Sequence, residues 1–177
     1  TLSMSNNVFA NNQWAAHATL SEETMDITLI NNVSNGSDAT GFGRNGFGLL
    51  GSINGTNTYT GQPDFPFIIW EDVTILEDAS LTLTPGTTVK FNDYYDDIWV
   101  LSRLYVTGTP NDSIVFTSIA GDYQGGDSNH DGRATSAAPN DWSTICYDPA
   151  SSGSLKYFFV SCGGGYHQST LYAQGNS

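Results

Sequence analysis

The segment "EDVTILEDASLTLTPGTTVKF", residues 71–91, carries three short apolar pairs separated by polar turns. The pairs are Val73 with Ile75, Leu81 with Leu83, and Val89 with Phe91. The members of each pair are two positions apart, which is the period of a strand with one buried face. The segment therefore predicts three consecutive strands, each with one side facing a core.

The next segment, "DDIWVLSRLYVTGTPNDSIVFTS" (residues 96–118), repeats this arrangement. Its pairs are Ile98 with Val100, Leu104 with Val106, and Ile114 with Phe116. The offsets are 25 residues from Val73 to Ile98, 23 from Leu81 to Leu104, and 25 from Val89 to Ile114. A unit of three strands recurring at this distance is typical of a solenoid. We therefore expect an all-β right-handed parallel β-helix with about 24 residues per coil, and all twelve apolar residues inside it.

The charge balance limits the partners. The chain has 18 acidic residues against five basic ones, a net charge of −13. Nucleic acids and anionic membrane surfaces are bound through Lys and Arg, so neither is an expected partner. No apolar run approaches the ~20 residues of a membrane-spanning helix, so membrane insertion is not expected. The composition suits a secreted, extracellular protein that binds cations.

A polar, glycine-rich stretch interrupts the repeat where a third coil is due. We predict a long inserted loop at residues 118–141, before apolar patterning resumes with "WSTICY". Within it, Asp127, Asn129 and Asp131 stand at alternate positions and are followed by Gly132. This is the first half of a calcium loop, which takes side-chain oxygens from positions 1, 3 and 5 and a backbone carbonyl from position 7, here Arg133.

The second half of an EF-hand loop is missing. Position 12, where a bidentate Glu belongs, is Ala138. A closing carboxylate must come from elsewhere, and Asp141 and Asp122 are the nearest candidates. We expect Ca²⁺ to hold the insertion, since a long loop without strands of its own needs an external constraint to be ordered. A solvated acidic turn is the alternative.

The stretch "NDYYDDIWV" is a second candidate site. It gathers acidic and aromatic residues, namely Asp93, Tyr94, Tyr95, Asp96, Asp97 and Trp99. Carboxylates beside aromatic rings are compatible with a polysaccharide-binding platform or a glycosidase centre, and equally with a loop whose rings cover a coil edge. A lyase would also need a basic residue near bound calcium. Lys90 belongs to the strand pattern "TVKF" and Arg133 is already in the calcium loop, so a non-enzymatic role is favoured and no catalytic residue is assigned.

The cysteines and histidines decide little. Cys146 and Cys162 permit one disulfide, but their strand positions point to opposite faces, so the bond stays open. The three histidines lack the spacing of zinc ligands.

Four segments together carry a family resemblance: "PFIIWEDVTILEDASLTLTPGTTVKF", "IWVLSRLYVTGTPNDSIVFTS", "GGDSNHDGRATSAAPNDWSTICY" and "LKYFFVSCGG". They resemble the right-handed parallel β-helix repeat regions of large secreted bacterial and archaeal surface proteins. The resemblance covers roughly residues 55 to 165 and implies that fold and an extracellular, cell-surface setting, without implying a reaction. Two departures from the pattern are Ser143-Thr144 in place of Gly-Gly, and Cys162 where an aromatic residue is common.

The N-terminal third has a different character. Residues 1–60 resemble the last coils of one block with a junction, including asparagine pairs that can stack in ladders, and residues 61–177 resemble the start of the next block. Strand-like sequence at both ends predicts uncapped edges, covered by further coils of a longer chain or by end-to-end self-association into a filament. We expect a structural or adhesive module stabilised by calcium, with a carbohydrate-binding or carbohydrate-active protein as the alternative.

Overall fold

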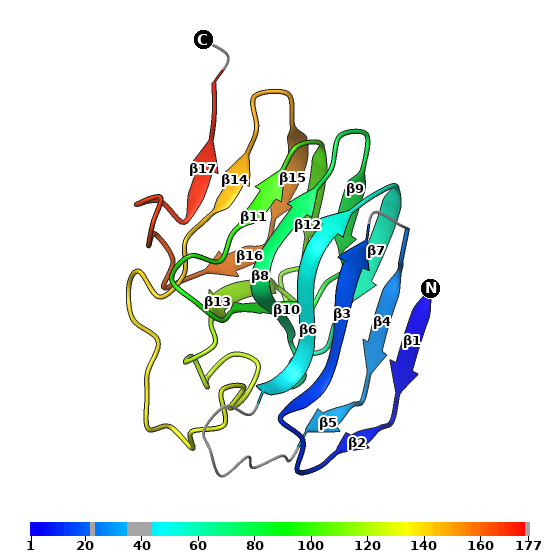
Figure 1. Ribbon diagram of the computed structural model, residues 1–177, viewed down its shortest axis with the longest axis vertical. Coiled ribbons are helices and arrows are strands. Elements are labelled where there is room, and N and C mark those ends of the chain that lie inside the picture. The colour runs from blue at the N-terminus through cyan, green and yellow to red at the C-terminus, as the bar shows by residue number, and fades with distance from the viewer. Residues whose placement is uncertain (22–23, 35–43, 176–177) are drawn as a thin grey trace.

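The protein is described by a computed structural model over residues 1–21, 24–34 and 44–175. Those residues form 17 strands and no helix, so they contain no helical segment able to cross a membrane. The strands belong to two large parallel sheets and one small pair (Figure 1). The protein is therefore all-β, as its alternating apolar pattern predicts.

The six-stranded sheet contains β1 (Leu2–Ser5), β4 (Ile27–Ile30), β7 (Thr56–Thr60), β9 (Ser80–Leu83), β12 (Arg103–Thr107) and β15 (Ser152–Lys156), in that spatial order. The nine-stranded sheet contains β3 (Trp14–Ser21), β6 (Arg44–Ile53), β8 (Phe67–Ile75), β10 (Thr88–Phe91), β11 (Ile98–Val100), β13 (Ile114–Ser118), β14 (Ile145–Tyr147), β16 (Phe158–Val160) and β17 (Leu171–Ala173). The small pair is β2 (Val8–Phe9) with β5 (Val33–Ser34).

Strand β8 is the branch point of the larger sheet. Its first part, Phe67–Ile69, pairs in parallel with β10, and its last part, Val73–Ile75, pairs in parallel with β11. One branch continues through β13 to β16 and the other through β14 to β17. On its other side β8 pairs with β6, and β6 with β3. A single long strand thus joins the N-terminal strands to both later rows.

The predicted β-helix with about 24 residues per coil is wrong. The strands lie in separate, open sheets rather than in one continuous coil of constant length (Figure 1). Paired residues are 25 positions apart at Leu2 and Ile27, 32 apart at Ile27 and Tyr59, and 47 apart at Ile98 and Ile145. An alternating pattern reports that strands stack with a shared buried face. It does not report whether the loops between them close each set of three strands into a regular turn.

The local register is confirmed in two rows and wrong in a third. Leu81 lies opposite Leu104, and Val73 opposite Ile98, as the repeat predicts. Val89, however, lies opposite Phe116 rather than Ile114. A shift of two residues returns the side chains to the same face of the strand, so the apolar pattern alone does not distinguish these two registers.

The core prediction is confirmed. All twelve apolar residues of the two repeated segments are buried in one cluster, and the largest exposed fraction among them is 4%. Strands of both large sheets contribute to this cluster, including Ile27 of β4, Phe47 of β6 and Phe67 at the start of β8. The sheets are therefore held together by one shared apolar interior.

Asparagine side chains link the N-terminal turns, as their pairing in the sequence suggests. The Asn7 amide donates to Asn32 Oδ1 at 2.9 Å, and Asn32 Nδ2 donates to the Met4 carbonyl at 2.8 Å. Gln62 Nε2 continues the row by donating to the Asn32 carbonyl at 2.8 Å. These bonds satisfy the Met4 and Asn32 carbonyls and link successive N-terminal segments through their polar side chains.

Replacing Leu104 by Ala tests the shared core. The Leu104 side chain is fully buried, so its truncation should lower the free energy of unfolding by about 2–5 kcal/mol. Chemical denaturation followed by circular dichroism measures this loss. The neighbouring exposed variant Arg103→Ala should change stability by no more than about 0.5 kcal/mol, and equal losses in the two variants would contradict the assignment.

Candidate functional site

The insertion is fixed at its C-terminal end by Trp142. This side chain is fully buried and stacks on Phe91 of β10, with ring centroids 3.9 Å apart and planes 2° from parallel. Its indole N–H donates to the Ser161 carbonyl at 2.8 Å. A Cβ on Gly163 would lie 2.7 Å from the ring, so the glycine is needed for this close approach. Trp142 therefore attaches the end of the loop to the strand stack.

Lys90 of β10 holds the start of the insertion. Its side chain is fully buried, and Nζ donates to the carbonyls of Gly121 at 2.9 Å and Gly126 at 2.6 Å. Burial lowers the pKa of Lys90 to about 8, while the nearby carboxylates of Asp122 and Asp127 act in the opposite direction. An ammonium group with two carbonyl acceptors and two acidic neighbours thus lies beneath the loop.

Asn45 of β6 contacts the same loop from the side. Its backbone N–H donates to the Ser128 carbonyl at 2.9 Å, and its amide donates to the Asp127 carbonyl at 2.8 Å. The amide nitrogen also lies 3.0 Å from His130 Nδ1. Strand β6 therefore holds the backbone at Asp127, the first residue of the calcium-type pattern.

The acidic turn has the hydrogen-bond pattern of a closed loop. The Asp127 carboxylate accepts from the N–H groups of Asp131 and Gly132, both at 3.0 Å. Gly132 has a φ of 62°, the left-handed conformation that favours glycine at a sharp turn. Asp131 in turn accepts from Asn129 Nδ2 at 2.9 Å and from the hydroxyl of Thr135. The turn is thus shaped by its own side chains.

Three carboxylates converge at this turn. Oxygen atoms of Asp122, Asp127 and Asp131 lie within 4.8 Å of one another, all on partly buried residues. Burial raises the pKa of Asp122, and the negative charges of Asp127 and Asp131 raise it further. Hydrogen bonds, chiefly from Thr135, lower the pKa of Asp131. Such mutual repulsion is relieved when a cation binds between the groups.

Two oxygen atoms at the turn lack hydrogen-bond partners. Asp122 Oδ1 and Asn129 Oδ1 are buried, and neither accepts a hydrogen bond from the described residues. Buried acceptors are usually satisfied, and carboxylate and amide oxygens are ligands that Ca²⁺ takes. Asp122, Asn129, Asp127 and Asp131 are therefore the side chains that fit a metal ion.

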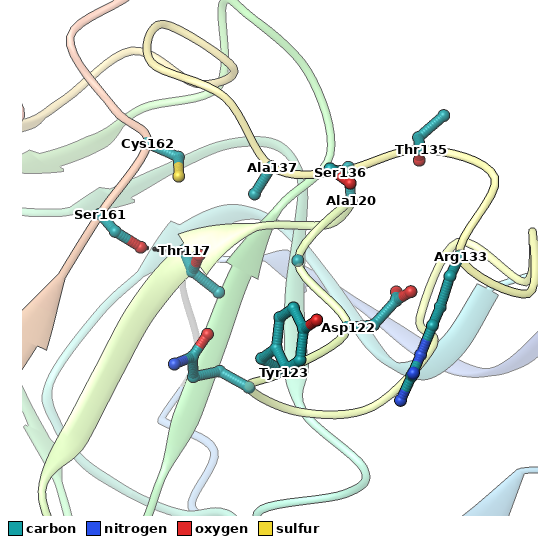
Figure 2. Close-up of a pocket in the computed structure, with 12 residues that line it drawn as sticks. Thr117, Ala120, Asp122, Tyr123, Arg133, Thr135, Ser136, Ala137, Ser161 and Cys162 are labelled. Carbon is teal, nitrogen blue, oxygen red and sulfur yellow. Dashed lines mark hydrogen bonds between the residues drawn. The ribbon is translucent and has the colours of Figure 1, made fainter.

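The other two predicted ligands are Asp141 and the backbone carbonyl of Arg133. Asp141 lies outside the cluster of three carboxylates, and its Oδ2 accepts from the Ala138 N–H at 2.9 Å. The Arg133 carbonyl stays a prediction, while the guanidinium of the same residue lies 5.7 Å from the centroid of the Tyr123 ring. Figure 2 shows Arg133 beside Asp122 at one side of a pocket of about 180 Å³. Solvent and ions therefore have access to the Asp122 side of the turn.

A row of aromatic rings crosses two neighbouring loops. Centroids are 4.9 Å apart for Tyr94 and Tyr95, 5.9 Å for Tyr95 and Tyr166, 5.1 Å for Tyr166 and His167, and 5.4 Å for His167 and Trp99. We call these five residues the tyrosine ridge. Tyr95 and Tyr166 are the most exposed, at 65% and 62%. The ridge joins the loop after β10 to the loop after β16.

The carboxylates near the ridge are structural. Asp96 is buried, and its Oδ2 accepts from the N–H groups of Asn92 at 2.9 Å and Asp93 at 2.8 Å. Asp97 is also buried, with Oδ1 accepting from the Thr144 N–H at 2.9 Å and Oδ2 lying 3.6 Å from His167 Nε2. These two side chains bind backbone groups, so they do not form an exposed pair of the glycosidase type; Asp93 remains exposed.

Both cysteines are free thiols. Cys146 is buried on the nine-stranded sheet, and burial raises the pKa of its thiol. Cys162 has a positive φ of 66° and lines the pocket in Figure 2. The disulfide left open by the sequence is absent from the described residues.

Several residues at these sites are not evident from the local sequence. Asn45, Tyr166 and His167 reach the insertion or the ridge from segments distant in the chain, and no local motif marks them. Lys90 carried a signal, because a lysine inside the apolar pattern "TVKF" must find acceptors if it is buried.

Comparisons with known proteins add no assignment. A scan against protein-family models and searches of curated proteins and solved structures found no match. The candidate sites therefore rest on the chemistry of their own residues.

Replacing Asp96 by Asn tests the role of the buried carboxyl. Burial is the main reason that the pKa of Asp96 is raised to about 7, against about 3.9 for an unperturbed Asp. Its stabilising contribution is therefore present below about pH 4 and is lost as the pH rises through about 7. We expect the free energy of unfolding of Asp96→Asn, measured relative to that of the parent protein by denaturation, to increase by at least about 1 kcal/mol between pH 4 and pH 8.

The matched control is Asp93→Asn on the same turn, where the side chain is exposed. Its stability difference from the parent should stay nearly constant between the two pH values. A constant difference for Asp96→Asn as well would contradict the assigned burial.

Proposed function

We propose that the protein is a non-enzymatic structural module that extends by strand addition at its open sheet edges, in an extracellular, cell-surface setting. The observation that carries this proposal is that the sheets are not closed. The resemblance of residues 55 to 165 to secreted surface proteins supports the extracellular, cell-surface location. The excess of acidic residues supports the binding of divalent cations.

Large apolar side chains are exposed near both ends of the stack, including Val8 of β2 at 67%. The outer strands are β1 and β3 at one end and β15, β16 and β17 at the other. Around the second group, large side chains are exposed, among them Phe159 at 46% and Tyr172 at 42%. A strand edge with free N–H and C=O groups and exposed apolar side chains is a template for another strand. Because different strands form the two ends, contacts between one end and the other are head-to-tail, and such contacts extend rather than close.

Calcium is the second part of the proposal. A Ca²⁺ ion held by Asp122, Asp127, Asn129 and Asp131 would neutralise the converging negative charges. It would also be coordinated by the two buried oxygen atoms that lack hydrogen-bond partners, Asp122 Oδ1 and Asn129 Oδ1. Contacts with Lys90, Asn45 and Trp142 already hold the loop in position. The ion would therefore rigidify an ordered loop rather than cause it to fold. The strand stack should survive without it.

Replacing Asp122 by Asn tests the calcium site. Asp122 Oδ1 has no hydrogen-bond partner among the described residues, so the substitution removes a charge without breaking an observed bond. The free energy of unfolding of the parent protein should increase by about 2.7 kcal/mol at a calcium concentration 100-fold above its Kd. Thermal unfolding with calcium and with a chelator should show that the variant loses most of this gain, whereas without calcium it matches or exceeds the parent.

Asp112→Asn is the charge-matched control, because Asp112 is exposed and lies outside the insertion. It should keep the full calcium response. An unchanged melting temperature of the parent on adding calcium would refute the metal assignment.

Replacing Ala173 by Pro tests strand addition. The Gln174 N–H donates to Tyr147 on β14, so the alternating pattern of a parallel strand points the Ala173 N–H away from β14. Proline removes that outward donor without removing a bond inside the sheet. Light scattering across micromolar concentrations should show association of the parent protein and loss of association in the variant.

Ala173→Ser keeps the N–H and should associate like the parent. A parent protein that stays monomeric at every concentration, or an Ala173→Pro variant that associates equally well, would overturn the strand-addition proposal.

A second candidate function is carbohydrate binding. The tyrosine ridge favours it, because exposed rings from two loops form a continuous surface. Tyrosine offers an apolar ring face together with a hydroxyl, which suits the mixed surface of a sugar. The buried roles of Asp96 and Asp97 favour binding over hydrolysis.

A further inference from the structure

A tryptophan-lined pocket lies on the nine-stranded sheet, away from the insertion. It has a volume of about 170 Å³ and is lined by Trp14, His17, Thr19, Leu50 and Trp70. These residues come from β3, β6 and β8, three adjacent strands. His17 and Thr19 are exposed, and the other three are partly buried. We call this cavity the tryptophan pocket.

The two indole rings form a rigid corner. Their centroids are 4.5 Å apart and their planes meet at 85°. Trp14 packs closely over Gly48, where a Cβ would lie 2.7 Å from the ring. The Arg44 guanidinium lies 5.5 Å from the Trp70 centroid, and Arg44 Nε donates to Asn92 Oδ1 at 2.9 Å. Trp14 is therefore held by its contact with Gly48, and Trp70 by its contact with Arg44.

The corner also presents unused polar groups. Neither indole N–H has an acceptor among the described residues, and neither is a buried unsatisfied atom, so both donors reach solvent. The His17 ring and the Thr19 hydroxyl stand exposed at the same pocket. Rigid apolar faces with a few convergent polar groups are the usual composition of a small-molecule site.

The size of the pocket and the net charge of the protein limit the kinds of ligand that can bind there. The cavity is well below the roughly 300–1,000 Å³ of a drug-sized site, so it accepts one small ring. A flat ring with apolar C–H faces and peripheral hydroxyls can stack on an indole and accept from its N–H. The net charge of −13 disfavours an anionic ligand. We propose that the tryptophan pocket binds a single pyranose ring of a neutral glycan.

This proposal extends the second candidate function. Arg44 links the two surfaces, since it contacts Trp70 and donates to Asn92, which directly precedes the loop that carries Tyr94 and Tyr95. A glycan chain on the ridge and a sugar ring in the tryptophan pocket would then occupy neighbouring parts of one surface. The two sites are nevertheless tested separately.

The four tryptophans provide the test. Their indole N–H groups give four resonances in a ¹⁵N–¹H correlation spectrum, assigned with single Trp→Phe variants. The probes are the neutral methyl glycosides of glucose, galactose, mannose and N-acetylglucosamine, with galacturonate as the anionic control. We expect saturable shifts of Trp14 and Trp70 with at least one neutral glycoside. Trp142 should not move, because it is buried and bonded to Ser161.

The outcomes separate this pocket from the ridge. Shifts confined to Trp99 would support the ridge and overturn the pocket. No shift of Trp14 or Trp70 with any neutral glycoside, or equal shifts with galacturonate, would also overturn it. If a long neutral polymer such as hydroxyethylcellulose leaves Trp99 unmoved while the glycosides shift Trp14 and Trp70, the ridge fails and the pocket stands.

A blocking variant guards against loss of folding. Thr19→Arg fills the pocket from an exposed position and leaves both tryptophans in place, so it should abolish the glycoside-dependent shifts. Tyr123→Ala, at a side chain that is 89% exposed in the insertion, should preserve them. Retention of the shifts in Thr19→Arg would contradict the proposed binding position.

Discussion

Parallel backbone pairing around β8 is the constraint on which the rest of the structure depends. Because β8 pairs with β6 on one side and with both β10 and β11 on the other, it sets the registers of three further strands. In a parallel pair, residues in register share a face. The apolar residues of successive strands must therefore meet in one interior, and polar segments are displaced to the turns.

The insertion illustrates how this constraint positions a loop. Lys90 and Phe91 are neighbours on β10 and point to opposite faces. Phe91 packs in the core against Trp142, while the Lys90 ammonium holds two carbonyls of the loop on the outer side. One dipeptide thus contributes to both attachments of a long polar segment. The acidic turn lies on this support, which explains why its carboxylates can converge despite their repulsion.

The outer surface uses aromatic residues in two ways. At the tryptophan pocket, the indoles are carried by paired strands and are held by Gly48 and Arg44. At the tyrosine ridge, loops carry the three tyrosines and His167, β11 carries Trp99, and the rings contact one another. The first arrangement is rigid and concave and the second is exposed and extended, so they suit a single ring and a longer chain respectively. The strong negative charge disfavours acidic ligands at both.

From the sequence alone, six strands within residues 71–118, their twelve buried residues and the long polar loop that follows could be predicted. Alternation reports which side of each strand is apolar, and a run of glycine and acidic residues cannot form a core. The sequence also marked six candidate metal ligands, Asp122, Asp127, Asn129, Asp131, Asp141 and the Arg133 carbonyl, of which Asp122, Asp127 and Asp131 converge. Only the tertiary structure decided that the sheets stay open, that Val89 pairs with Phe116, and that Asn45, Tyr166 and Trp70 reach their sites. These depend on loop lengths and on contacts between segments far apart in the chain, which local periodicity does not encode.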